Sequence, residues 1–171
     1  VPLRGRNREF VQQGLRLLSQ LPEGPVRQFI ERSGVDAENA TARDVAFRLA
    51  PRLNAAGRMA SPDLALEGLL EGGDAVERLD MLNTQRRAAM QRSWERARNS
   101  LPTEVPAFLW TASEEDAPGI VGLVAGKLTE AYGRPSMAVS IRGEECTASL
   151  RSTSAYDIAS GLTRASHLLT T

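Results

Sequence analysis

The chain contains few of the residues that disulfides and metal sites require. Cys146 is the only cysteine and His167 the only histidine among its 171 residues. An intrachain disulfide and a zinc site built on paired cysteines are therefore excluded. The single cysteine favours a reducing, cytoplasmic setting. We expect Cys146 to be a buried, unreactive thiol within a strand, and His167 to have a structural role.

Long apolar runs and net charge are also missing. The sequence has no stretch of about 18 apolar residues, the length needed to cross a membrane. The N-terminal VPLRGRNREF lacks the apolar core of a signal peptide. Because 21 Lys and Arg balance 21 Asp and Glu, any anion site must come from local clusters of charge. With 42% hydrophobic and 25% charged residues, we expect a soluble globular chain. The missing initiator Met indicates a fragment.

Helical patterns fill the first part of the chain. Thr41 and Asp44 have the spacing of a capping box, and Pro51 is expected to kink the helix that follows. Ser61, followed by Pro and Asp, predicts the start of another helix. The longest uninterrupted helical stretch runs from residue 74 to residue 100. This part of the chain is therefore predicted to be helical, with a long helix connecting it to the rest.

After Pro102 the pattern changes to a mixture of strands and helices. The predicted elements are a buried strand over 106–112, a helix over 118–135, a pair of strands over 136–142 and 145–152 joined by a tight turn, and a closing helix over 156–169. The fold class is therefore α/β: a helical N-terminal region with a long connecting helix, followed by a small α/β domain. Pro102 to Pro106 is the predicted boundary.

Three arginines lie close together in the stretch RLAPRLNAAGRMASPDLAL. On a helix, Arg48 and Arg52 share a face and repel each other by a few tenths of a kcal/mol, and Asn54 lies beside Arg58. One interpretation is that an anion binds opposite these side chains. In the alternative interpretation, the arginines pair with acidic residues of the chain, namely Asp44, Asp63 or Glu67.

Charges also cluster elsewhere. Between Asn83 and Leu101 the sequence has five arginines and one acid, Glu95. This part of the long helix is either a solvated face or a face toward nucleic acid or another domain. We interpret the acidic run over 114–116 as a solvated loop rather than a cation site.

A second candidate anion site lies in the stretch ASLRSTSAYDI. Ser149, Arg151 and Ser152 fall where a strand gives way to a helix, so hydroxyls, a guanidinium and helix N-terminal amides could converge on one phosphate. In the alternative, the hydroxyls only cap the helix. Neither a cluster of His and carboxylates nor a nucleophile with a base is visible. We therefore assign no catalytic residue and no metal ligand.

Four stretches together resemble the RecJ family of single-strand-specific 5′ to 3′ DNA exonucleases, members of the DHH phosphoesterase superfamily. They are VPLRGRNREFVQQGL, FRLAPRLNAAGRM, PGIVGLVAGKL with YGRPSMAVS, and SLRSTSAYDI. The resemblance covers nearly the whole chain. It implies that residues 1–20 are the C-terminal end of the DHH catalytic domain, 21–101 a helical interdomain region, and 102–171 a truncated DHH-associated α/β domain.

The resemblance implies the substrate-binding portion of a nuclease that acts in DNA repair and recombination. Asn54 and Arg58 match by position the residues with which the family faces single-stranded DNA, and Arg52 is a further candidate. Ser149 and Arg151 match the residues expected at the 5′ phosphate, and Ser152 is a further candidate for that phosphate. In the family, manganese or magnesium is held by Asp and His motifs upstream of Val1. We therefore expect this chain to bind no cofactor by itself and to be inactive alone, with Mn or Mg in the full-length enzyme.

The implied partners are single-stranded DNA, the DHH catalytic domain and replication or repair proteins, with no membrane. The apolar stripe of Val11, Leu15 and Leu18 should pack on that catalytic domain. Asp116 and Ala117 stand where many members have Trp-His, so no substrate contact is assigned to that loop. The alternatives are another DHH phosphoesterase, acting on oligonucleotides or cyclic dinucleotides, and a non-catalytic nucleic-acid-binding scaffold.

Overall fold

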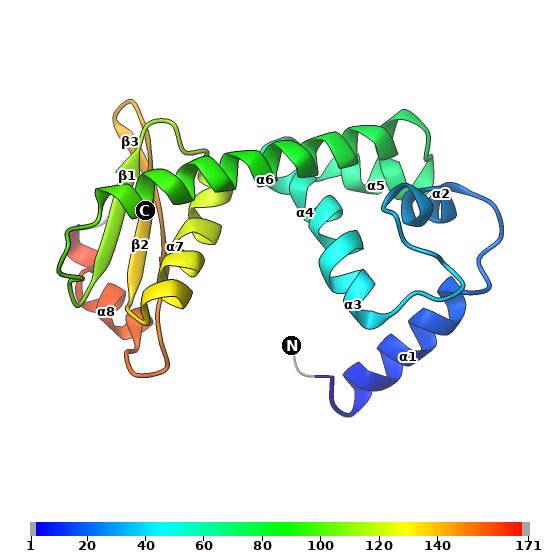
Figure 1. The fold of residues 1–171 in the computed structure, drawn as a ribbon, viewed down its shortest axis with the longest axis horizontal. Helices are drawn as coiled ribbons and strands as arrows, with labels where there is room; N and C mark the ends of the chain where they lie inside the picture. The colour runs from blue at the N-terminus through cyan, green and yellow to red at the C-terminus, as the bar shows by residue number, and fades with distance from the viewer. Residues whose placement is uncertain (1–2, 169–171) are drawn as a thin grey trace. The chain divides into compact units, whose positions relative to one another are not determined.

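The computed structural model describes residues 3–168, which form two compact units that meet after Arg86. The first unit contains α1 (Arg6–Leu18), α2 (Pro25–Arg32), α3 (Ala42–Asp44), η1 (Val45–Leu49), α4 (Ala50–Met59), α5 (Asp63–Leu70) and the first half of α6 (Asp74–Ser100) (Figure 1). The second contains the rest of α6, β1 (Leu109–Ser113), α7 (Pro118–Tyr132), β2 (Ser136–Arg142), β3 (Glu145–Arg151), α8 (Ile158–Arg164) and η2 (Ser166–Leu168). The α/β fold class is confirmed.

The boundary between the units lies inside α6, whereas the sequence places it at residues 102–106. The second half of α6 carries Met90, Trp94 and Ala97, which pack into the core of the second unit. Burial of this apolar side ties that half of the helix to the sheet. The linker after the helix is therefore internal to the second unit.

Local sequence signals explain how the helices of the first unit begin. The Thr41 side chain accepts a hydrogen bond from the Asp44 amide, and the Asp44 carboxylate accepts one from the Thr41 amide, so the predicted capping box is confirmed. Pro51 has no amide hydrogen to donate to the carbonyl four residues earlier. The expected distortion takes the form of the π-helical turn η1 directly before α4.

The core of the first unit gathers buried residues of α2, η1, α4, α5 and α6. Phe29, Ile30, Ala56, Leu64 and Leu79 are among its buried members. Helix α1 has no buried residue. Its apolar side instead lines an open groove of about 530 Å³, formed by Leu3, Val11, Gly14, Leu15, Leu18, Ala42, Val45 and Ala46.

The second unit is built on a three-stranded sheet in the order β1-β2-β3. Strand β1 pairs in parallel with β2, and β2 pairs antiparallel with β3, so that Ala138 stands opposite both Thr111 and Ser149. Gly143, with φ 61°, supplies the left-handed conformation that the tight turn between β2 and β3 needs. The predicted pair of strands and its turn are therefore confirmed.

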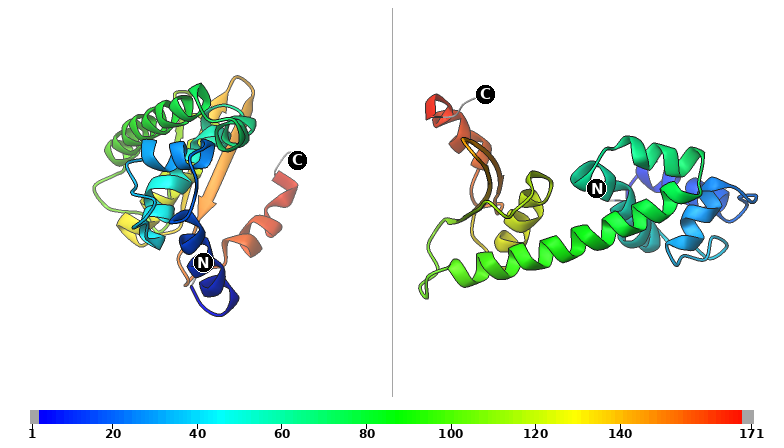
Figure 2. Two further views of the ribbon diagram at one scale, coloured as in Figure 1. Left: turned by 90° about the vertical axis from the view of Figure 1, so that its right-hand side faces the viewer. Right: turned by 90° about the horizontal axis from the view of Figure 1, so that it is seen from above.

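Helix α7 packs on one face of this sheet (Figure 2). Leu109 and Ala138 are fully buried on that face. The alternate residues Trp110 and Cys146 are exposed on the other face, Trp110 to 62%. The expectations of a fully buried first strand and of a buried cysteine are therefore wrong, because α7 covers only one side of the pleat.

The closing helix is shorter than the sequence pattern predicts. Helix α8 begins only after Asp157 and ends at Arg164, and a single 3₁₀ turn, η2, follows. The side chain of Asp157 accepts hydrogen bonds from two amides of the first turn, which fixes this start. Residue 169, the last of the predicted helix, lies outside the described residues.

Candidate nucleic-acid interface

Helix α4 presents two different faces. Arg52, Ala55 and Ala56 follow the i, i+3, i+4 spacing that places residues on one side of a helix, and both alanines are 0% exposed. Asn54, Gly57 and Arg58 have the same spacing on another side. Asn54 and Gly57 are exposed and Arg58 is half-buried. We call Asn54, Gly57 and Arg58 the α4 polar face.

Arg52 is held inside the first unit. Its Nε donates a hydrogen bond to Asp80 Oδ1 at 2.8 Å, and its Nη1 donates to the Arg48 carbonyl at 2.8 Å. Its side chain is only 19% exposed. Arg48 in turn lies 3.5 Å from the Asp44 carboxylate and donates to the Gly34 carbonyl. The intramolecular interpretation therefore describes both arginines, although Arg52 pairs with an acid on α6 that the sequence did not single out.

The α4 polar face leaves the helix backbone open to a ligand. A Cβ at Gly57 would meet only the Pro62 Cβ, at 3.8 Å. Asn54 carries a side-chain amide for which the described residues 3–168 offer no hydrogen-bond partner. Arg58 adds a positive charge one turn later, in the last turn of the helix. A polyanionic chain could thus approach the backbone between an amide and a guanidinium.

The structure brings Ser149 and Arg151 together on β3. Residues two apart in a strand share a face, and Arg151 Nη1 donates hydrogen bonds to Ser149 Oγ at 3.1 Å and to the Leu150 carbonyl at 2.7 Å. We call Ser149 and Arg151 the β3 pair. A guanidinium beside a hydroxyl is a donor set suited to a phosphate.

Gly122 of α7 makes room for the β3 pair. A Cβ at this position would lie 3.1 Å from Ser149 Oγ and 3.2 Å from Arg151 Nη2. These are closer than ordinary van der Waals contacts, so a side chain here would displace both groups. The sequence predicts small residues on one side of this helix, but not which glycine faces the phosphate candidates.

The remaining parts of the predicted phosphate site do not assemble as expected. Ser152 Oγ donates to the Tyr156 carbonyl at 2.8 Å, so its proton is committed to the turn. The amides of Ala159 and Ser160, which begin α8, donate to the Asp157 carboxylate. Hydrogen bonding to the Ser160 hydroxyl and to these amides lowers the pKa of Asp157. An acid therefore occupies the helix start where the sequence suggested a phosphate.

Asp116 also differs from its sequence interpretation. Its side chain is 3% exposed and forms an ion pair with Arg96 of α6, whereas the acidic run was expected to be a solvated loop. Glu115 and Glu114 are exposed, as expected. One arginine of the cluster on α6 is therefore committed within the second unit.

Two kinds of feature are absent from the part of the chain that the structure describes. Residues 3–168 contain no group of three or more His, Cys, Asp or Glu that could hold a metal ion. Among the helices they form, none is long and apolar enough to span a membrane.

Comparison with known proteins gives one consistent family. No family model matches the chain. It is 30% identical over 152 residues to the single-stranded-DNA-specific exonuclease RecJ of Bacillus subtilis, and 34% identical over 161 residues to that of Dickeya dadantii. These matches cover 85% and 84% of the chain, but only 19% and 27% of the relatives. The chain thus spans about a fifth to a quarter of their length.

Solved structures agree with the sequence matches. RecJ from Thermus thermophilus in complex with Mg²⁺ matches all of the chain with a TM-score of 0.86 and 28% identity, over 27% of its own chain. A second structure, of exonuclease RecJ bound to manganese, matches 95% of the chain with a TM-score of 0.78 and 28% identity, over 41% of its own chain.

Proposed function

The chain is homologous to a segment of the RecJ single-stranded-DNA-specific exonucleases, and on this premise we propose that it is the substrate-binding portion of such an enzyme. The complete enzyme would hydrolyse phosphodiester bonds of single-stranded DNA from the 5′ end, in DNA repair and recombination in the cytoplasm. Residues 1–20 would close its DHH domain, 21–101 form the interdomain region, and 102–171 belong to the DHH-associated domain. The names of the relatives support the substrate class.

The observation that carries this proposal is the β3 pair. A guanidinium has five N–H donors, and the hydrogen bonds among the described residues use Nη1. Nε and Nη2 remain for an anion. Ser149 Oγ accepts the bond from Arg151 and keeps its own proton to donate. The pair can therefore hold a 5′ phosphate by charge-assisted hydrogen bonds without giving up its present contacts.

The α4 polar face would contact the DNA backbone. Contacts to phosphates and sugars fix the position of a strand without reading its sequence, which suits an exonuclease that acts on any sequence. Asn54 and Arg58 supply these contacts in the proposal. Arg52 enters it as the residue that fixes α4 on α6 through Asp80, so its contribution to DNA binding is indirect.

The metal and the catalytic domain would come from outside this segment. Mg²⁺ or Mn²⁺ is present in the related structures, but the described residues of this chain do not fit a metal site. The apolar groove along α1 supports the proposal that the DHH domain packs there, because a contiguous apolar surface that stays open is typical of an interaction site.

The test compares two substrates that differ only at the 5′ end. In the full-length protein, Arg151→Ala should weaken binding of a 5′-phosphorylated oligonucleotide at least about tenfold, because a hydrogen bond to a charged group contributes roughly 1.5 to 3 kcal/mol. Ser149→Ala should act in the same direction with a smaller effect. Binding of the 5′-hydroxyl oligonucleotide should change little in both variants.

Arg134→Ala serves as the matched control, because it removes an exposed arginine from the same unit without touching the β3 pair. It should leave the ratio of the two affinities unchanged. Equal losses on both substrates in Arg151→Ala would refute recognition of the 5′ phosphate by the β3 pair.

A further inference from the structure

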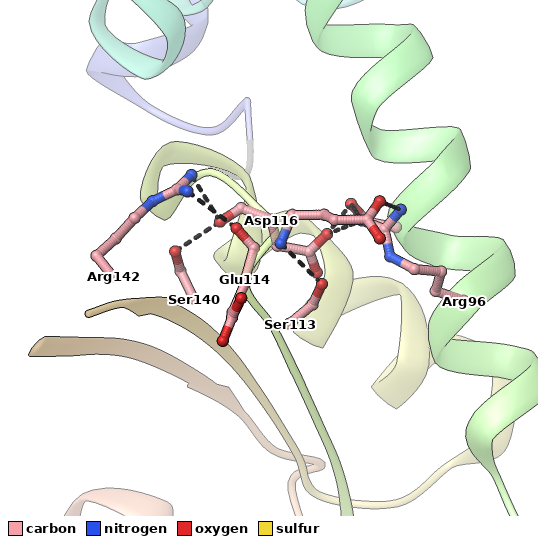
Figure 3. Close-up of polar contacts among 8 residues, drawn as sticks. Arg96, Ser113, Glu114, Asp116, Ser140 and Arg142 are labelled. Atoms are coloured by element: carbon pink, nitrogen blue, oxygen red, sulfur yellow. Dashed lines mark hydrogen bonds and ion pairs between the residues drawn. The ribbon is translucent and has the colours of Figure 1, made fainter. Parts of the chain in front are cut away.

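Asp116 lies at the centre of a buried polar network in the second unit (Figure 3). Its carboxylate oxygen Oδ1 accepts hydrogen bonds from Ser93 Oγ, at 2.5 Å, and from Arg96 Nη2. Both donors are on α6. Arg96 is held by two carboxylates, because its Nη1 also donates to Glu115, while its buried Nε finds no acceptor among residues 3–168.

The main chain of the same residue is fixed from the other side. The carbonyl oxygen of Asp116 accepts from Ser140 Oγ of β2 at 2.5 Å and from Arg142 Nη2 at 3.3 Å. Arg142 Nη1 also holds the Glu114 carbonyl at 2.9 Å. Two elements, α6 and β2, thus grip one residue of the loop. We call Ser93, Arg96, Asp116, Ser140 and Arg142 the Asp116 clamp.

The position of the clamp along the chain gives it a consequence for α7. Asp116 stands two residues before Pro118, the first residue of α7, and the N-cap residue Ala117 has no side-chain hydrogen bond of its own. The start of the helix is therefore anchored through Asp116. Because Asp116 is buried and charged, removing its partner would leave an uncompensated charge in the interior.

One turn into α7, Gly122 faces the β3 pair. A Cβ added at Gly122 would lie only 3.1 and 3.2 Å from the two polar groups, so the β3 pair lies beside α7 in a space that only glycine leaves open. A shift of the helix toward β3 would narrow the space beside the hydroxyl and the guanidinium, and a shift away would widen it. The placement of α7 therefore controls the geometry of the donor set.

We propose that the Asp116 clamp positions the β3 pair for a terminal phosphate by fixing the N-terminal turn of α7. Arg96, Asp116 and Ser140 are then positioning residues that act through α7 and do not contact the DNA. This inference rests on the proposed function, because it assumes that the β3 pair binds the 5′ phosphate.

The test measures the ratio of affinities for 5′-phosphorylated and 5′-hydroxyl oligonucleotides in the full-length protein. Partial unfolding of a variant lowers both affinities by the same factor. If the clamp residues only stabilise the fold, the ratio therefore stays unchanged. Arg96→Ala should lower the ratio at least about threefold. A misplacement of about 1 Å can cause a loss of about a hundredfold, so a smaller shift of the β3 pair is enough for this effect. Arg96→Lys keeps the charge without the fork and should fall between wild type and Arg96→Ala.

Two further variants serve as a second test of the clamp and as a control for charge. Ser140→Ala removes one neutral hydrogen bond to the Asp116 carbonyl and should also lower the ratio. Circular dichroism checks that this variant is folded. Ser140→Ala therefore still tests the proposal if Arg96→Ala does not fold. Arg98→Ala removes an exposed arginine from the same helix and should leave the ratio unchanged.

The outcomes separate the two proposals. If Arg151→Ala abolishes the preference for a 5′ phosphate while Ser140→Ala and the Arg96 variants leave it intact, the clamp proposal is overturned and the proposed function stands. If Arg98→Ala lowers the ratio as much as Arg96→Ala, the effect is one of charge and the clamp proposal is also overturned. If Arg151→Ala leaves the preference intact, both proposals fail.

Discussion

Replacing Arg52 by Ala should lower the stability of the first unit and leave the salt dependence of DNA binding unchanged. Arg52 lies on the side of α4 that carries the fully buried Ala55 and Ala56, and it pairs with Asp80 of α6. Arg58 lies on the α4 polar face. The two arginines of the same helix should therefore differ in their effect on the salt dependence of DNA binding.

The magnitude follows from the contacts of Arg52. Its side chain is 19% exposed and that of Asp80 is 35% exposed, so their ion pair should contribute at most about 1 kcal/mol. The hydrogen bond from Nη1 to the Arg48 carbonyl adds about 0.5 to 1.5 kcal/mol. We therefore expect a loss of about 2 kcal/mol. Each kcal/mol corresponds to roughly 4 to 8 °C in melting temperature for a unit of this size.

The assay uses the location of the tryptophans. Trp94 and Trp110, the two tryptophans of the chain, both lie in the second unit. Tryptophan fluorescence therefore follows the second unit, whereas far-ultraviolet circular dichroism also follows the helices of the first. Arg52→Ala should lower the midpoint of the circular-dichroism transition more than that of the fluorescence transition. Asp80→Ala should do the same, and the double variant should lose less than the sum.

DNA binding gives the second readout. In the full-length protein, Arg58→Ala should flatten the dependence of log affinity on log salt by about 0.7, the value for one lost phosphate contact on a single strand. Arg52→Ala should leave this slope as it is. A flattened slope with an unchanged melting curve in Arg52→Ala would refute the assignment of Arg52 to the interior pair.

Three further predictions address other parts of the molecule. Gly122→Ala should weaken the preference of the full-length protein for a 5′-phosphorylated end, whereas Gly126→Ala, whose nearest neighbour would be 4.0 Å away, should not; equal effects in competition binding would contradict the role of Gly122. The Thr41 hydroxyl, with its amide, lowers the pKa of Asp44, so this carboxylate stabilises the folded chain above its unfolded-state pKa and loses that effect as pH falls through the folded-state pKa. Thr41→Ala should raise the pKa of Asp44 in an NMR titration, and an unchanged value would contradict the capping box. Because the described residues offer no cluster of metal ligands, the 171-residue chain alone should not shorten a labelled single strand in Mg²⁺ or Mn²⁺, and metal-dependent cleavage by the purified chain would refute this.

Local signals in the sequence were sufficient for most of the elements. The capping box at Thr41, the distortion at Pro51, the long helix α6 and the β2–β3 pair all depend on residues close to one another in the chain. The predicted length of α8 was wrong because Asp157 caps the helix after the predicted start and because a 3₁₀ turn, η2, replaces the α-helix after Arg164. The prediction that Cys146 is buried was wrong, because the pattern of apolar residues in a strand does not show whether a second layer covers the sheet.

The candidate site shows the same limit. The spacing in β3 places Ser149 and Arg151 on one face, and the structure joins them by a hydrogen bond. Neither the Arg52–Asp80 pair, 28 residues apart, nor the link from Arg96 to Asp116, 20 residues apart, follows from any local pattern. For these two ion pairs the sequence offered only opposite charges in separate parts of the chain, and such charges allow many pairings.

The central claim is that the β3 pair binds the 5′ phosphate of a single strand. The most direct measurement is a residue-resolved NMR titration of the 171-residue chain with a short single-stranded oligonucleotide, carried out once with a 5′ phosphate and once with a 5′ hydroxyl. The account predicts chemical-shift changes at Ser149, Arg151 and Gly122 that require the phosphate and disappear in Arg151→Ala. Identical shifts with both oligonucleotides, or phosphate-dependent shifts confined to other residues, would contradict it.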